Sequence, residues 1–183
     1  MPRRLRVDLA DLIDALDDAS GEVSAYLDLE SGEVIRITAE IQRELEAIAT
    51  ELAEESLDEE AYRAAFAAAV DRRGPPAWMR ELLWEADAVD ACLGTRFLPV
   101  PGADSRAGYE DMEAFIETVA SRRVQEHLWG ATRGRGAFRR FKDAVAGHPA
   151  ERERWFAFRD GRARRRALAW LADEGIEPVE EGG

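Results

Sequence analysis

Arginines and aromatic side chains crowd the segment from Gly134 to Asp160, GRGAFRRFKDAVAGHPAERERWFAFRD. Guanidinium groups donate paired hydrogen bonds to phosphates and carboxylates, and aromatic rings stack on planar groups. Residues 122–166 carry 14 basic side chains and five carboxylates, whereas the rest of the chain carries 11 basic and 33 acidic groups. This segregation predicts an anionic partner, which is either a separate molecule or the acidic part of the chain itself.

The turn GATRGRGAFRRFKD and the helices after it form the candidate anion- or partner-binding site. Glycines let a backbone approach a ligand closely, and the N–H groups at the start of a helix can face a phosphate. The candidate arginines are Arg133, Arg135, Arg139, Arg140, Arg162 and Arg165. A plain connection between two helices with solvated arginines explains the same residues, because glycines are common at helix ends.

The aromatic residues of this segment have two interpretations. Five rings could stack bases beside the arginines, namely Phe138, Phe141, Trp155, Phe156 and Phe158. Phe138 with Phe141 and Trp155 with Phe158 have helical spacing, which favours the core of packed helices. Arg159 and Asp160 are predicted to form an internal ion pair.

The sequence contains no recognisable catalytic or metal-binding set. His127 and His148 are the only histidines and Cys92 is the only cysteine. None of the spacings matches a metal site or a phosphate-binding loop. We therefore expect no catalytic residue, no metal and no cofactor, with Cys92 as a small core residue. An acidic hydrolase or transferase site, using Asp28, Glu30 or Asp160, is a third and weaker hypothesis.

Composition favours a packed, soluble protein. The 183 residues are 46% hydrophobic and carry a net charge of −13, which suits a globular fold and favours solubility. No apolar run approaches the roughly 20 residues that cross a bilayer, and Asp8 and Asp11 interrupt any signal peptide. A single cysteine forms no intrachain disulfide. We expect a cytoplasmic protein that does not bind membranes.

The elements of the N-terminal half begin with a helix capped by Asp8. AYLDLESGEVIRI predicts a β-hairpin around Ser31-Gly32, with a bulged three-residue loop that pairs Leu27 with Ile35. Further helices are expected to begin at Thr38, at the Ser56–Glu59 capping box and near Pro76. FLPVPG predicts a short strand whose prolines indicate either an edge strand or the end of a strand. Trp78 and Trp84 flank the apolar stripe of their helix and mark either an association surface or a contact with the preceding helix.

The C-terminal half is predicted to be helical throughout. Gly147 and Pro149 separate two helices, Gly161 marks a bend in the last one, and Gly175 ends it. The fold class is therefore α+β, a mostly helical body with a small antiparallel hairpin near the N-terminus. We predict one domain over 1–183, which admits a subdivision into an acidic region, 1–105, and a basic helical region, 106–183.

Four segments, DLIDALDDAS, YLDLESGEV, GAFRRFKDAV and ERERWFAFRD with the later ALAWLADEGIEP, resemble a family of bacterial proteins called Uncharacterised Protein Family 0158. Residues 56–78 look like a helical insertion that the family pattern does not require. The resemblance implies a bacterial origin and supports the element boundaries. It implies no activity, cofactor or catalytic residue.

These observations favour a non-catalytic bacterial adaptor or binding protein. Its Arg-rich helical face would engage an acidic protein partner or a second copy of the chain, since charge complementarity fixes partner choice. The alternative is a protein that binds nucleic acid or another phosphoanion with the same arginines.

Overall fold

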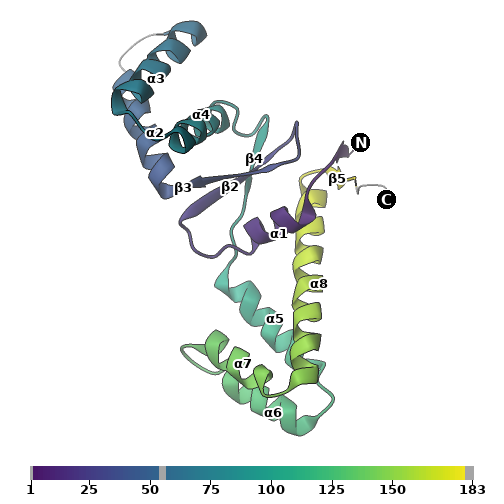
Figure 1. The fold of residues 1–183 in the computed structure, drawn as a ribbon. Coiled ribbons are helices and arrows are strands. Elements are labelled where there is room, and N and C mark those ends of the chain that lie inside the picture. Colours follow the sequence, from purple (N-terminus) through teal and green to yellow (C-terminus); the bar gives the residue numbers. More distant parts are fainter. Residues whose placement is uncertain (1, 54–56, 180–183) are drawn as a thin grey trace. The chain divides into compact units, whose positions relative to one another are not determined.

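A computed structural model describes residues 2–53 and 57–179 of the chain (Figure 1). It confirms the predicted α+β class, a mostly helical protein with a small antiparallel sheet. The chain divides into two compact units, which we call the sheet unit, residues 20–101, and the helical unit, residues up to Ala19 and from Gly102 onwards. The first helix thus belongs with the C-terminal helices. The extent of independent domains stays a prediction.

The sheet unit contains three antiparallel strands, β2 (Val23–Asp28), β3 (Val34–Thr38) and β4 (Phe97–Val100), in the order β3-β2-β4. β4 is an edge strand, as its sequence predicts. The edge position suits Pro99, which has no N–H to donate to a further strand.

The hairpin register differs by one residue from the predicted register. Leu27 pairs with Val34 and Tyr26 pairs with Ile35, so the predicted pairing of Leu27 with Ile35 is wrong. The loop has four residues, because the Asp28 carboxylate accepts a hydrogen bond from the Glu30 N–H at 2.8 Å and organises the turn. A shift of one residue changes which side chains share a face.

Three helices complete the sheet unit: α2 (Ala39–Leu52), α3 (Glu59–Arg73) and α4 (Ala77–Ala91). Thr38 caps α2 as predicted, since its Oγ1 accepts a hydrogen bond from the Ile41 N–H at 3.3 Å. Asp58 caps α3 through the Ala61 N–H at 2.9 Å. Ser56, at which the predicted capping box begins, lies outside the described residues.

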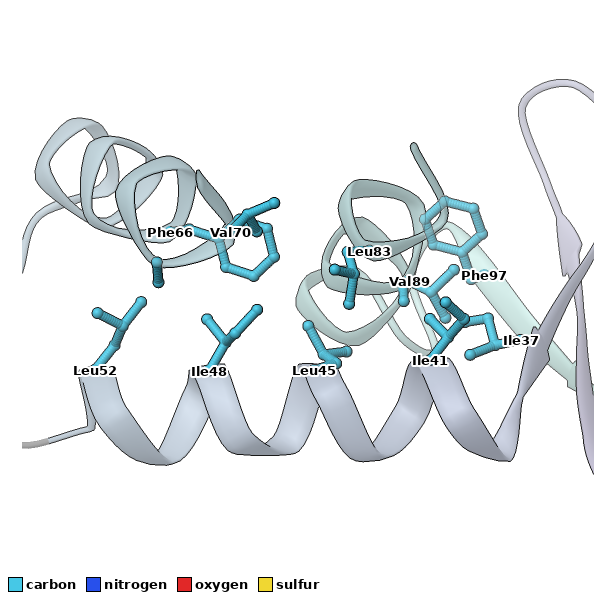
Figure 2. Close-up of a cluster of buried hydrophobic side chains, with 12 residues drawn as sticks. Ile37, Ile41, Leu45, Ile48, Leu52, Phe66, Val70, Leu83, Val89 and Phe97 are labelled. Atoms are coloured by element: carbon cyan, nitrogen blue, oxygen red, sulfur yellow. The ribbon is translucent and has the colours of Figure 1, made fainter. Parts of the chain in front are cut away.

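The core of the sheet unit is built on one stripe of α2. Ile41, Leu45, Ile48 and Leu52 follow at helical spacing and are buried. Figure 2 shows these side chains pointing toward Phe66 and Val70 of α3 and toward Leu83 and Val89 of α4. Each large apolar side chain buried in this way contributes roughly 1.5–3 kcal/mol to folding.

A hydrogen bond between α3 and α4 predicts a change at alkaline pH. The Tyr62 hydroxyl donates to Asp87 Oδ1 at 2.7 Å. Burial, and then the Asp87 carboxylate, raises the pKa of Tyr62 to about 12. Because the folded pKa lies above the ordinary value of about 10, this stabilisation is present below about pH 10 and disappears as the pH rises through about 12.

We expect an absorbance titration to show a tyrosine that ionises near pH 12. Tyr62→Phe should remove that late step, whereas Tyr109→Phe should retain it. Absence of a step near pH 12, or its persistence in Tyr62→Phe, would contradict the role of the Tyr62–Asp87 hydrogen bond.

The helical unit contains five helices: α1 (Leu9–Leu16), α5 (Ser105–Glu117), α6 (Arg122–Ala131), α7 (Ala137–Ala146) and α8 (Pro149–Asp173). β1 (Arg3–Leu5) and β5 (Ile176–Pro178) form a parallel pair that the sequence did not predict. α8 runs as one helix through Gly161, and the bend predicted near Gly161 stays a prediction. Among the described residues, no helix combines the length and the apolar character needed to cross a bilayer.

Aromatic rings form the centre of the helical unit. The Phe115 ring, fully buried, contacts the rings of Phe141, Trp155 and Phe158. The predicted core positions of Phe141 and Trp155 are therefore confirmed, and Phe158 packs partly buried against them. The core position predicted for Phe138 is wrong. Phe138 and Phe156 instead remain 47% and 39% exposed, because they project away from this cluster.

Candidate functional site

The turn between α6 and α7 depends on two glycines and one arginine. Gly134 and Gly136 have φ angles of 74° and 80°, in the left-handed region that glycine adopts without steric cost. The Arg140 guanidinium folds back onto the turn. It donates hydrogen bonds to the carbonyl oxygens of Arg133, Gly134 and Arg135. Arg140, a candidate site residue, thus holds the turn in place.

Arg162, another candidate, belongs to an ion-pair network between helices. The Asp111 side chain is only 3% exposed and accepts hydrogen bonds from Arg162 Nε and from Arg166 Nη1, the latter at 2.7 Å. Arg166 also pairs with Asp17 at 3.1 Å. The network joins α5 and α8 to the end of α1. The positive charge of Arg162 is therefore paired with Asp111 inside the helical unit.

The other four candidate arginines are exposed. Within residues 2–53 and 57–179, Arg133, Arg135, Arg139 and Arg165 have no carboxylate partner. The first three lie on the turn and the first turn of α7, and we call them the basic turn. Arg165 lies apart from them in the sequence, on α8. The charges of the basic turn are therefore not neutralised by a carboxylate among the described residues.

Phe138 lies on α7 within the basic turn. One edge of its ring lies over Gly108 of α5, where an added Cβ would be 2.9 Å from Phe138 Cε1. Because Gly108 has no side chain, the Phe138 ring can pack directly against the backbone of α5. Its 47% exposure leaves the remaining ring surface open to a partner.

Phe156 on α8 is also an exposed aromatic residue beside arginines. The guanidinium carbons of Arg152 and Arg159 lie 5.3 Å and 5.9 Å from the centre of its ring. Both distances are in the range of cation–π interactions. Arg159 also pairs with Asp160 at 3.3 Å, as predicted, but both side chains are exposed. Such a pair contributes little to stability.

The two histidines meet beside the α6–α7 pair. His127 Nδ1 and His148 Nε2 are 3.3 Å apart, a long hydrogen bond between α6 and the residue before α8. His127 also lines an open hollow of about 590 Å³ with Glu126, Arg140 and Asp143. In the part of the chain that the structure describes, no cluster of three or more histidine, cysteine or acidic side chains could hold a metal ion.

Of the three carboxylates in the third hypothesis, Asp28 and Glu30 share one arginine in the sheet unit, whereas Asp160 pairs with Arg159 in the helical unit. Arg96 donates from Nε and Nη2 to the two oxygens of Asp28, at 3.0 Å and 2.7 Å, and its Nη1 lies 3.1 Å from Glu30. Burial alone would raise the pKa of Asp28. Hydrogen bonds from Arg96 and from the Glu30 N–H outweigh it, so the pKa lies below its usual value. Asp28 is thus an ionised partner of Arg96.

This lowered pKa predicts a loss of stability in acid. A carboxyl group whose folded pKa is depressed stabilises the protein above its unfolded pKa, about 3.9, and the effect disappears as the pH falls through the folded value. We expect Asp28→Asn to lower the free energy of unfolding at neutral pH. The difference from wild type should shrink below about pH 4. A difference that stays constant across this range in urea titrations would contradict the assignment.

Asp111 is the residue of the helical unit that the sequence analysis missed. A detectable signal exists, because Asp111 and Phe115 are four residues apart on one helix and therefore share a face. An aspartate on the apolar face of a helix needs a buried cationic partner. The pattern alone does not say which arginine supplies it.

The fold is that of a mostly helical α+β protein, and Arg133, Arg135 and Arg139 are exposed on its helical unit. The model of the Uncharacterised protein family (UPF0158) matches residues 90–182, and the chain belongs to this family. The match includes β4 and every element from α5 to β5. The resembling segments before residue 35 and the predicted insertion at 56–78 lie outside it. No curated protein and no solved structure matches the chain.

Proposed function

We propose that the protein is a non-catalytic bacterial adaptor or binding protein that acts in the cytoplasm and engages an acidic protein segment through the basic turn. One observation supports this proposal. Arg133, Arg135 and Arg139 are exposed and have no carboxylate partner among the described residues, while Arg140 and Arg162 hold the fold together. An ion pair inside the fold would already have neutralised the three charges.

The chemistry of these residues suits an acidic segment. Guanidinium groups bind carboxylates in a two-pronged geometry. Phe138 adds an exposed aromatic surface next to Arg139, and arginine and aromatic residues dominate the binding energy of protein interfaces. Rim charges mainly raise the association rate, so binding should weaken with salt.

A second copy of the chain is one form that the acidic partner can take. The sheet unit, residues 20–101, carries 18 acidic and seven basic side chains in its sequence. Self-association through opposite charges predicts a molecular mass that rises with protein concentration and falls with salt. Light scattering over both variables measures it.

Nucleic acid remains the second candidate, because Phe138 and Phe156 are exposed next to arginines. Single-strand binders combine stacking rings with basic side chains in this way. If this alternative holds, the logarithm of the affinity should fall linearly with the logarithm of the salt concentration.

Fluorescence anisotropy at low salt separates these candidates. The probes are a labelled polyglutamate peptide and labelled single- and double-stranded oligonucleotides. We expect the protein to bind the peptide and to leave both oligonucleotides free. Preference for an oligonucleotide would favour the alternative, and binding of none of the probes would remove both.

A further inference from the structure

The solvent-facing side of α4 carries two exposed tryptophans. Trp78 is 55% exposed and Trp84 is 36% exposed, whereas Leu83, Ala86 and Val89 point into the core of the sheet unit. Residues three or four apart are neighbours on a helix. Glu81 therefore lies between the two tryptophans, and Glu85 follows it. We call Trp78, Glu81, Trp84 and Glu85 the α4 face.

The carboxylates of the α4 face are not used in ion pairs within the described part of the chain. Within the described residues, neither Glu81 nor Glu85 forms an ion pair. Arg80, which is the basic residue of α4, pairs with Asp71 of α3. Burial, and then the negative charge of Glu33, raises the pKa of Glu85 above its usual value. Glu33 thus adds negative charge near Glu85.

We propose that the α4 face is the docking surface for a cationic amphipathic segment of a protein partner. Charge complementarity selects this occupant. Its apolar side chains would cover the tryptophans. Its arginines or lysines would reach Glu81 and Glu85 and the faces of the indole rings, which attract cations. An acidic segment would be repelled, and a neutral one would gain the apolar contact alone.

This surface extends the proposed function rather than repeating it. The basic turn and the α4 face have opposite charge and belong to different units. A protein with two such surfaces can hold two partners of opposite charge, which is what an adaptor does. The two surfaces can also be tested separately, because the substitutions that disable one leave the other intact.

The probe is a synthetic amphipathic peptide of leucine and arginine, compared with a version that has glutamine in place of arginine. Isothermal titration with the full-length protein should show weaker binding of the glutamine version. Trp78→Ser and Glu81→Gln should each lower the affinity for the arginine peptide about two- to fivefold. Trp78 is the better position for substitution, because the Trp84 ring contacts the core ring of Phe66 at 4.6 Å.

Glu117→Gln and Glu153→Gln, at exposed positions of the helical unit, make the same charge change and should leave the affinity unchanged. Unaltered thermal unfolding of Glu81→Gln shows that the variant is folded. Equal binding of the two peptides, or equal losses in the control variants, would overturn the proposal. A second copy of the chain could cover the α4 face instead. If Trp78→Ser converted a dimer of this protein into a monomer and left the affinity for the peptide unchanged, the proposal would also be overturned. Substitution of the basic turn should not weaken the binding of the arginine peptide. A negative result for the α4 face is therefore distinct from a negative result for the proposed function.

Discussion

Replacing Asp111 with alanine is expected to lower the free energy of unfolding of the helical unit by about 3–5 kcal/mol. The Asp111 carboxylate is 3% exposed and receives hydrogen bonds from two arginines, Arg162 and Arg166. Both guanidiniums are themselves about two-thirds covered. Removal of the carboxylate leaves their charges partly buried without their main partner, which costs more than the pair contributes when intact.

Urea unfolding followed by circular dichroism measures this loss. Glu110→Gln is the matched control, because Glu110 lies next to Asp111 on α5 but pairs with Arg106 at the surface, at 2.9 Å. Exposed pairs of this kind contribute about 0.3–0.5 kcal/mol. A loss in Asp111→Ala as small as the loss in Glu110→Gln would show that the network does not hold the helices together.

Replacing Phe115 with alanine is the second change with a large expected effect, a loss of about 3–5 kcal/mol. The ring is fully buried, with its centre 5.2 Å from the Trp155 ring and 5.6 Å from the Phe158 ring. The substitution removes these contacts and leaves a cavity that the surrounding helices fill only in part.

Phe156→Ala is the comparison for this prediction, since Phe156 is 39% exposed. It should cost about 1 kcal/mol or less, because an exposed ring loses little burial. Thermal unfolding measures both variants under the same conditions. Similar melting temperatures for the two variants would place Phe115 outside the cooperative core.

The local signals of the sequence predicted most of the elements. Asp8 and Thr38 begin helices where their side chains can cap the backbone, and prolines mark β4 as an edge strand. The hairpin register was wrong because a single side-chain contact of Asp28 lengthened the loop by one residue. The β1–β5 pair joins the two ends of the chain, and strands of three residues carry no readable pattern.

The sequence predicted which segment carries the candidate site, but not which of its arginines form contacts within the fold. Charge counting identified the basic segment, yet it could not say which arginines the fold uses. Asp111 and Arg162 are 51 residues apart, and Arg140 binds backbone carbonyls that have no sequence signature. The spacing of Phe138 and Phe141 indicated core positions for both. Packing left Phe138 exposed, because helical spacing gives a shared face without stating what covers it.

The most direct test of the basic turn compares two triple variants with equal net charge. One carries Arg133→Ser, Arg135→Ser and Arg139→Ser. The control carries Arg63→Ser, Arg106→Ser and Arg122→Ser, at exposed arginines that each pair with a glutamate on their own helix. Affinity for the labelled polyglutamate peptide is measured at low salt. We predict that the first variant binds about tenfold more weakly or worse, while the control stays close to wild type. Equal losses in both variants would show that total charge, and not the basic turn, binds the acidic partner.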